Sequence, residues 1–488
     1  MMKRICEFDK RPRDYNLIVV GGSPPGLACA KKAASLGANV AVFANLSNTE
    51  EVLQQEMFLE MLYHAGKHRT LLKEAQNYSW KFGLHLLKPV LLQKLQELKK
   101  VTREKCKKRL ECFLDKKRID YYVNCKLILG YPITVAVSDY PEDFFTSTYM
   151  VLAPIGTYEY PDIYGAKLGL LPKDLMEMEQ IDGNILIAGG GSDALELASS
   201  FIQMGQSTTL ISRSGVTSCF DDQMMTLYVK TLMENGLKLF LKTIIKCLKK
   251  TEDNKIQVEY ITLSKSWKGC QIFDYVIFVE KPFVNLKRLK LQKLNLKTIF
   301  NTIPTNKELE TNIRNVFAIG PALQHSTFNR GVDIQMGKNL ARHLFLSRKI
   351  EILEINDKTG VIRGPIVDYS FTGLTENAAT LLYGADNLEV YHGYYKPTEY
   401  GIAKKSHDYC YLKIICLKTK DELVIGMHIL GPYAATIMQG YTAAMRSGVT
   451  YSRLANLAGI FPTVAREFTL VNITKRSGVE PKLQSCCS

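Results

Sequence analysis

A glycine-rich turn between an apolar strand and a helix constrains the fold of this chain more than any other feature. In segment 184–214, an apolar run leads into three glycines, a helical pattern and a second β-rich run. Gly189, Gly191 and Ala194 have the spacing GxGxxA. In this context the spacing is typical of dinucleotide-binding βαβ units: the glycines allow a tight turn and close approach of a pyrophosphate, and the small third residue lets helix and strand pack. The segment therefore predicts a nucleotide site at the helix N-terminus.

The residues after the second strand of this unit indicate which nucleotide it binds. A carboxylate at this place would bind the ribose 2′-hydroxyl of NAD, but Ser212 and Arg213 stand here. An arginine favours a 2′-phosphate and hence NADP. The alternative is a solvated arginine at the end of a strand.

A second unit of the same type begins near the N-terminus. The run 16–20 (NLIVV) predicts a strand, and the turn 21–26 (GGSPPG) leads into an alanine-rich helix that ends at Gly37. A further strand is expected at 39–43. The chain therefore carries two dinucleotide-type units in an α/β fold.

The glycine turn of this first unit is weaker as an anion site. Gly21, Gly22 and Gly26 are present, but Ser23 brings a β-carbon to the position where a phosphate should come close. The two prolines that follow carry no N–H, so two potential phosphate donors are missing. No carboxylate follows the second strand, where a ribose partner is expected.

The rest of the chain indicates further domains, and a length of 488 residues suggests about three in total. The β-rich runs 275–280 (YVIFVE) and 316–320 (VFAIG) favour a return of the chain to the first sheet. From about residue 361, alternating strands are followed by helices, which predicts a separate α+β domain.

Composition and charge limit where the protein can be located and which classes of partner it can bind. The net charge is +15, and segment 94–118 predicts a basic, exposed helix, but no nucleic-acid-binding module accompanies it. No stretch approaches the roughly 18 apolar residues of a membrane span. The 12 cysteines lack zinc-type pairs, and the N-terminus has no apolar signal region. We expect a soluble cytoplasmic protein, with a mitochondrial location less favoured, that binds no metal, nucleic acid or membrane.

The last motif is QSCCS, in which Cys486 and Cys487 are adjacent. Neighbouring cysteines can close only a strained eight-membered ring, so their disulfide should be easily reduced. This favours a thiol-exchange site. A double-cysteine prenylation tail and chance are the alternatives.

Taken together, the two dinucleotide units, the closing NITKRSG of the α+β domain and the terminal SCCS resemble the thioredoxin reductases of the selenium-free, insect type. The likeness is densest in segments 389–395, 413–432, 439–448 and 461–478. It implies the following domains: a discontinuous FAD-type domain (12–160 and 291–360), an inserted NADPH-type domain (161–290), a C-terminal α+β dimerisation domain (361–480) and a redox tail (481–488).

The resemblance also implies cofactors and partners: FAD, NADPH, a second subunit and thioredoxin-like proteins. The residues it assigns to FAD are Gly21, Gly22 and Gly26, and those it assigns to NADPH are Gly189, Gly191, Ala194, Glu196 and Arg213. In the family, electrons pass from NADPH to FAD, to an N-terminal CxxxxC disulfide, to the C-terminal pair of the partner subunit and then to thioredoxin.

The chain departs from the family along this electron path. No cysteine occurs between Cys29 and Cys106, and the helical segment 47–66 stands in place of the CxxxxC dithiol. The histidine of the family's HPxxxE element is Phe461 and its glutamate is Arg466, so the acid/base pair is missing.

Further departures concern the cofactors. The family's ATG turn falls at 153–155, and the aspartate of its AIGD motif is Pro321. On the NADPH side, one of two phosphate-binding arginines falls at Ser218 and the nicotinamide-gating tyrosine falls at Ser192.

These departures favour a catalytically impaired member of the family that forms a homodimer, or a heterodimer with an active thioredoxin reductase that it would inhibit. One alternative is an active NADPH/FAD-dependent reductase with electrons rerouted through Cys29 or Cys106 and the C-terminal pair. Another is a protein that binds NADP(H) or thioredoxin without turnover. A degenerating gene is the remaining alternative.

Overall fold

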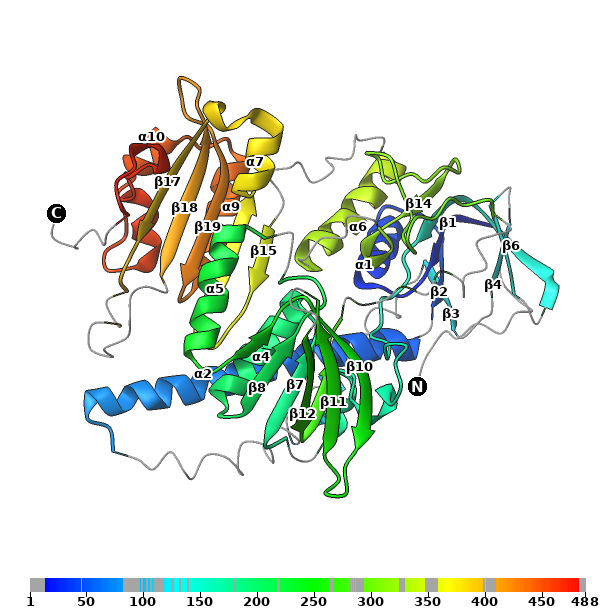
Figure 1. Cartoon of the computed structure of the whole chain (residues 1–488). Helices are drawn as coiled ribbons and strands as arrows, with labels where there is room; N and C mark the ends of the chain where they lie inside the picture. Colours follow the sequence, from blue (N-terminus) through cyan, green and yellow to red (C-terminus); the bar gives the residue numbers. More distant parts are fainter. Residues whose placement is uncertain are drawn as a thin grey trace. The chain divides into compact units, whose positions relative to one another are not determined.

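The structure, a computed structural model, is shown in Figure 1. Besides a few isolated positions, it describes residues 14–44, 46–81, 118–123, 127–130, 133–137, 140–178, 181–216, 220–263, 267–280, 294–323, 330–346, 359–397 and 410–481. The chain divides into two compact units: Met1–Met57, Glu97–Glu159 and Pro282–Glu354 form the first, and Phe58–Gln96, Tyr160–Lys281 and Ile355–Ser488 form the second. Most of the basic segment 94–118 lies outside the described residues. No helix in the described ranges is long and apolar enough to cross a membrane.

The first unit is built on a seven-stranded sheet with the order β3-β2-β1-β6-β5-β4, in which β14 also pairs with β6. Its strands are β1 (Asp14–Val20), β2 (Val40–Ala44), β3 (Ile119–Val123), β4 (Leu127–Gly130), β5 (Thr134–Val137), β6 (Tyr140–Leu152) and β14 (Val316–Ala318). The pairs β1–β2, β2–β3, β1–β6 and β6–β14 are parallel, while β4, β5 and β6 pair antiparallel. The predicted parallel βαβ unit at the N-terminus is therefore present.

Two helices of this unit pack closely against each other. Helix α1 (Pro24–Ser35) starts with prolines, whose fixed φ suits a first turn, and the chain turns after it at Gly37, which has φ +99°. Helix α6 (Arg330–Leu346) packs on α1. A β-carbon at Gly337 would lie 2.2 Å from the Pro25 carbonyl oxygen, so only glycine allows this approach.

The inserted domain of the second unit has two sheets. The parallel sheet has the order β13-β7-β8-β9, and the antiparallel sheet has the order β10-β11-β12. The strands are β7 (Asn184–Ala188), β8 (Ser207–Ile211), β9 (Lys238–Phe240), β10 (Thr243–Lys250), β11 (Ile256–Thr262), β12 (Trp267–Phe273) and β13 (Tyr275–Phe278), and the helices are α4 (Ser192–Gln203) and α5 (Asp222–Glu234).

One strand expectation is wrong. The run 275–280 does not return to the first sheet, because β13 pairs in parallel with β7 of the inserted domain. In that position Val276 and Ile277 are fully buried, so the pairing completes the core of the inserted sheet. Only 316–318 returns, as β14 beside β6.

The C-terminal domain is α+β, as expected. Its antiparallel sheet has the order β15-β16-β19-β18-β17. The elements are β15 (Thr359–Ile362), β16 (Asp368–Gly373), α7 (Glu376–Tyr383), β17 (Leu388–Tyr394), β18 (Tyr411–Leu417), β19 (Val424–Gly431), α9 (Ala434–Arg446) and α10 (Tyr451–Ala455). Helix α9 packs on β16 and β19, and α5 of the inserted domain also contacts β19. Every residue of β19 is buried.

A buried ion network joins the inserted and C-terminal domains within the second unit. Lys413 of β18 has no exposed side-chain surface, and its Nζ lies 2.5 Å from Asp221 Oδ1 and 2.8 Å from Glu376 Oε2. Asp221 is also the N-cap of α5, where it accepts the Met224 N–H. Burial alone would raise the pKa of the Asp221 carboxyl, but His428, when protonated, and the Lys413 ammonium outweigh it and hold that pKa well below its usual value.

A chain of hydrogen bonds extends this network into the sheet. The Asp221 N–H donates to Tyr369 Oη, which lies 3.0 Å from His428 Nδ1. His428 Nε2 lies 2.9 Å from the Leu374 carbonyl oxygen. Burial lowers the pKa of His428 to about 4, so the ring is neutral at pH 7. A neutral ring donates from Nε2 and accepts at Nδ1 from Tyr369.

We predict that Lys413→Met lowers the free energy of unfolding by about 3–5 kcal/mol, because it leaves the Asp221 carboxylate buried without its cation. Equilibrium denaturant unfolding measures this loss. Lys249→Met is the matched control, since Lys249 pairs with Glu259 at 2.6 Å on the exposed surface of the same unit and its loss should have little effect. Equal losses in the two variants would contradict the role of the network.

Candidate functional site

The second glycine turn has the geometry of an open nucleotide site. Gly189 has φ +155°, and a β-carbon there would lie 2.1 Å from the Val279 carbonyl oxygen, so the turn requires glycine. Gly191 caps the N-terminus of α4, is exposed, and would have no atom within 4 Å of an added β-carbon. Ala194 is fully buried against the sheet. The helix N-terminus is therefore free to receive an anion.

Arg213 lies at the same edge of the inserted sheet, two residues after the end of β8. Its side chain is exposed. The preceding residue, Ser212, is buried beneath the glycine turn and donates a hydrogen bond to the Gly215 carbonyl oxygen at 2.8 Å. Because the carboxyl ends of parallel strands meet at one edge, Arg213 and Gly191 follow strands that end at the same edge of the sheet. Ser192 begins α4 beside it, whereas Ser218 lies outside the described residues.

Glu196 has a different partner from the one expected. Its Oε1 accepts the backbone N–H of Arg363 at 2.8 Å, and burial raises the pKa of its carboxyl to about 8. The structure thus uses this side chain to hold α4 to the chain just after β15. Sequence spacing alone does not show whether a glutamate on a helix binds a nucleotide or holds the helix to a neighbouring segment.

The first glycine turn keeps its structural glycines. Gly21 has φ +115°, and a β-carbon there would lie 2.1 Å from the Ala153 carbonyl oxygen. A β-carbon at Gly26 would lie 2.5 Å from the Ala153 β-carbon. These two positions therefore serve the tight turn and the packing of α1 on β6, as in an intact dinucleotide unit.

Most of the backbone N–H groups that a flavin pyrophosphate would need at this turn are either missing or already bonded to backbone carbonyl oxygens. Pro24 and Pro25 open α1 without N–H groups. The Ser23 N–H donates to the Ala153 carbonyl oxygen at 3.2 Å, and the Gly21 N–H donates to the Phe43 carbonyl oxygen at 2.8 Å.

The residue that would bind the ribityl chain of the flavin also differs from that of the family. Pro321 of the 3-10 turn η8 (Gly320–Ala322) stands where the family has a carboxylate for the ribityl chain, and a proline side chain accepts no hydrogen bond. The residues present at this turn do not fit a flavin dinucleotide.

Helix α2 (Leu46–Ala75) occupies the segment where the family has its dithiol, as the helical pattern of 47–66 predicted. It contains no cysteine. Cys29, on α1, is fully buried, and burial raises the pKa of its thiol to about 12. A thiol with this pKa is almost entirely protonated at pH 7 and is a poor nucleophile. Cys106, Cys486 and Cys487 lie outside the described residues.

In the second unit, residues 58–75 of α2 are held by the inserted and C-terminal domains. Arg69 Nη1 donates to the Gln203 carbonyl oxygen at 2.6 Å, and Thr70 Oγ1 donates to Gln203 Oε1 at 2.8 Å. The Arg363 guanidinium lies 4.0 Å from the centre of the Tyr63 ring. Hydrogen bonds and a cation–π contact thus hold this helix in place, and none of the groups that make them can undergo a redox reaction.

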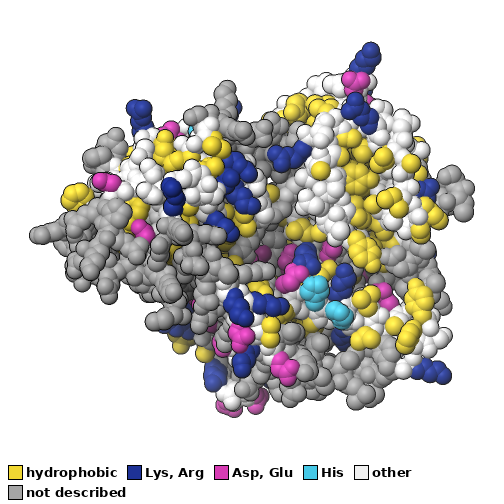
Figure 2. Space-filling view, turned by 180° about the vertical axis from the view of Figure 1, so that it is seen from behind, with side chains coloured by type: hydrophobic (Ala, Val, Ile, Leu, Met, Phe, Trp, Pro, Cys, Tyr) yellow, Lys and Arg dark blue, Asp and Glu magenta, His cyan; other side chains and the backbone are white. Residues whose placement is uncertain are grey.

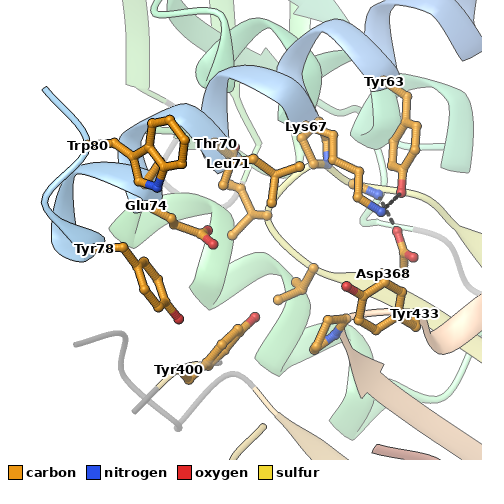
Figure 3. A pocket seen from close by; sticks show the side chains of 16 residues that line it. Tyr63, Lys67, Thr70, Leu71, Glu74, Tyr78, Trp80, Asp368, Tyr400 and Tyr433 are labelled. Carbon is orange, nitrogen blue, oxygen red and sulfur yellow. Dashed lines mark hydrogen bonds between the residues drawn. The ribbon is translucent and has the colours of Figure 1, made fainter. Parts of the chain in front are cut away.

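A cavity of about 340 Å³ lies beside this part of α2 (Figure 3). Lys67 projects toward it, with its Nζ 5.6 Å from the Tyr63 ring centre and 5.3 Å from the Tyr433 ring centre. Glu74 and Asp368 are the acidic residues of its lining, and no lining residue is a cysteine. The cavity therefore contributes nothing to an electron path.

The acid/base position of the family holds an aromatic ring. Phe461 is 68% exposed, and the Arg466 guanidinium lies 5.3 Å from its ring centre. Phenylalanine has no titratable proton, and arginine stays protonated, so this pair cannot shuttle protons. Ile460, which precedes Phe461 in the sequence, and Leu457 are also exposed. In Figure 2, where the C-terminal domain lies at the upper right, hydrophobic side chains gather on the face of the domain in view.

Comparison with known proteins agrees with this architecture. Residues 15–337 match the model of the pyridine nucleotide-disulphide oxidoreductase family, and residues 366–471 match the dimerisation domain of that family. The chain is 33% identical to thioredoxin reductase 2, mitochondrial, of Drosophila melanogaster, over 98% of this chain and 95% of that protein. It is 30% identical to thioredoxin reductase SEP1 of Emiliania huxleyi, over 97% and 98% of the two chains.

Two dinucleotide-type units, one of them inserted, followed by an α+β dimerisation domain, thus occur in the order and over the length found in these relatives. The chain belongs to the pyridine nucleotide-disulphide oxidoreductase family and is a thioredoxin reductase-like protein.

Proposed function

We propose that this chain is a catalytically impaired thioredoxin reductase-like subunit that regulates an active relative by pairing with it. The observation that carries the proposal is the exposed Phe461 at the acid/base position of an otherwise intact dimerisation domain. Neither Phe461 nor Arg466 can transfer a proton to a leaving thiolate. The absence of cysteine from α2 supports the same conclusion for the step before it.

In a mixed dimer, each half-site would combine the flavin face of one subunit with the C-terminal domain of the other. One half-site would have the relative's flavin face but would receive Phe461 in place of a histidine. The other would have this chain's first unit, which has no proximal dithiol. Both half-sites should therefore fail or slow, and the mixed dimer should be inhibitory.

We predict that an isolated mixed dimer of this chain with an active thioredoxin reductase reduces thioredoxin about 100-fold more slowly than the relative's homodimer, because general acid/base catalysis contributes at least that much. The two chains would be co-expressed with different affinity tags, the mixed dimer purified on both tags, and NADPH-dependent thioredoxin reduction measured. Undiminished activity in the mixed dimer would contradict the proposal.

A pair of substitutions gives this experiment a matched control. Phe461→His with Arg466→Glu in this chain should restore one of the two half-sites and raise the activity toward about half of the relative's homodimer value. Leu457→His introduces the same side chain at a neighbouring exposed position and should restore nothing.

A second function, NADP(H) binding without turnover, is favoured by the open glycine turn at Gly191 and the exposed Arg213. This function is compatible with the first, because nucleotide binding by the inserted domain needs no flavin. Nucleotide binding would make the regulation of the active relative by this subunit depend on the concentration of NADP(H).

We predict that Arg213→Ala raises the dissociation constant for NADP⁺ about tenfold or more, because it removes charge-assisted hydrogen bonds to the 2′-phosphate, and leaves weak NAD⁺ binding unchanged. Isothermal titration calorimetry on the full chain measures both constants. Lys250→Ala removes an exposed cation elsewhere in the same domain and serves as the control. Equal affinity of wild type and Arg213→Ala for NADP⁺ would count against the site.

A reductase with rerouted electrons through Cys29 is disfavoured by the burial of that thiol. We predict that alkylation of the native chain at neutral pH leaves Cys29 unlabelled, because its raised pKa and burial remove the reactive thiolate, while the exposed Cys270 is labelled. Peptide mapping by mass spectrometry reports both residues in one sample. Rapid labelling of Cys29 in the folded chain would contradict this prediction and support a reductase whose electrons pass through Cys29.

A further inference from the structure

We infer that Ser212 is a positioning residue for NADP(H), whose buried hydroxyl closes the turn that carries Arg213 and holds this turn on the second glycine turn. The inference rests on the proposed binding of NADP(H) and names the residue that keeps the phosphate-binding arginine in place. Residues 212–215, which directly follow β8, are called the Arg213 turn below.

The Ser212 hydroxyl closes the Arg213 turn. Ser212 is 3% exposed, and its Oγ donates a hydrogen bond to the Gly215 carbonyl oxygen at 2.8 Å. Only Arg213 and Ser214 lie between the two bonded residues, and both are exposed. The hydrogen bond therefore fixes the two ends of the turn while the Arg213 side chain stays accessible to a ligand.

The start of the Arg213 turn is bonded to the strands beside it. The Ser212 N–H donates to the Phe240 carbonyl oxygen at the end of β9, at 2.9 Å. The Ser212 carbonyl oxygen accepts the Thr243 N–H at the start of β10, also at 2.9 Å. Because the backbone of Ser212 is held by two strands, its hydroxyl is a fixed point to which Gly215 is bonded.

The Arg213 turn also packs on the second glycine turn. A β-carbon at Gly190 would lie 2.3 Å from the Gly215 carbonyl oxygen and 2.4 Å from Ser212 Oγ, so only glycine leaves room for this hydrogen bond. The neighbouring Gly189 N–H donates to the Ile211 carbonyl oxygen at 2.9 Å. The backbone that carries Arg213 is therefore held against the segment that we propose approaches the pyrophosphate.

The first unit has a related contact with a different result. Thr49 Oγ1 packs on Gly22 and donates to the carbonyl oxygen of that same glycine, at 3.1 Å. No lysine or arginine occurs between β2 and Thr49. A hydroxyl beside the middle glycine is thus common to both units. The second unit differs because its hydroxyl closes a turn that carries a cation.

A fixed turn should strengthen the binding of a 2′-phosphate. Ordering a chain segment opposes binding, and a segment that is already ordered avoids this cost. Loss of the Ser212 hydroxyl would also leave the Gly215 carbonyl oxygen, which is packed against Gly190, without this donor. We therefore expect Ser212 to act on NADP(H) through Arg213 and to have no effect on NAD(H), which lacks the 2′-phosphate.

Isothermal titration calorimetry on the full chain tests this inference. Ser212→Ala should raise the dissociation constant for NADP⁺ about three- to tenfold, the range expected for one hydrogen bond, and leave that for NAD⁺ unchanged. The matched control is Thr208→Val, which removes a fully buried hydroxyl at the other end of β8 that also donates to a backbone carbonyl, that of Gln206 at 3.2 Å. It should change neither constant. Equal losses for NADP⁺ and NAD⁺ in Ser212→Ala, or an equal loss in Thr208→Val, would overturn the inference.

A double-mutant cycle shows whether the hydroxyl acts through the arginine. In an Arg213→Ala background, Ser212→Ala should cause no further rise in the dissociation constant for NADP⁺, because the residue that it positions is already gone. Independent effects, with the two fold-changes multiplying, would overturn the inference. Failure of the wild-type chain to bind NADP⁺ would overturn the NADP(H) proposal as well. Wild-type binding that Ser212→Ala leaves unchanged would overturn the role of Ser212 alone.

Discussion

The buried ammonium of Lys413 is the interaction on which the second unit depends. A lysine with no exposed surface is stable only if its charge is matched, and here Asp221 and Glu376 match it from different elements. Lys475 adds a second cation to Glu376, at 2.5 Å. Because Asp221 also caps α5, the same carboxylate organises a helix of the inserted domain and binds a strand of the C-terminal domain. Loss of Lys413 would leave the buried Asp221 carboxylate without this cation, so the network depends most on this lysine.

The buried ion network is complete, whereas the residues at the family's redox positions are replaced. The network holds the dimerisation domain to the nucleotide domain. The residues at the family's redox and acid/base positions differ instead: α2 has no thiol and Phe461 stands at the histidine position, while Cys29 is buried. We therefore propose a subunit that pairs and binds a nucleotide but does not pass electrons from its own first unit.

Much of this could be predicted from the sequence, because the decisive signals are local. Both glycine turns, the helix at 47–66 and the change to α+β character near residue 361 follow from spacing and periodicity over short windows. The expectation that 275–280 returns to the first sheet is wrong, because a short apolar run does not show which partner strand it will meet. Glu196 follows the nucleotide motif in sequence, but its contact with the Arg363 N–H spans 167 residues and leaves no local signal.

The hydrogen bond between Thr49 and Gly22 shows the same limit. The sequence shows that Ser23 and the prolines weaken the anion site, but Thr49 lies outside any motif, and its contact with Gly22 depends on where α2 begins. The network at Lys413 is equally hidden, since a lysine in the apolar run of β18 gives no hint of its partners. Contacts between distant segments, rather than residue types, decide these features.

The central claim, that the scaffold of a disulfide reductase persists here without its electron relay, is tested most directly by NADPH oxidation. The purified homodimer would be mixed with NADPH and oxidised thioredoxin, and the absorbance of NADPH followed over time. We expect a rate equal to that of a sample without protein. Sustained NADPH oxidation over many turnovers, coupled to thioredoxin reduction, would contradict it.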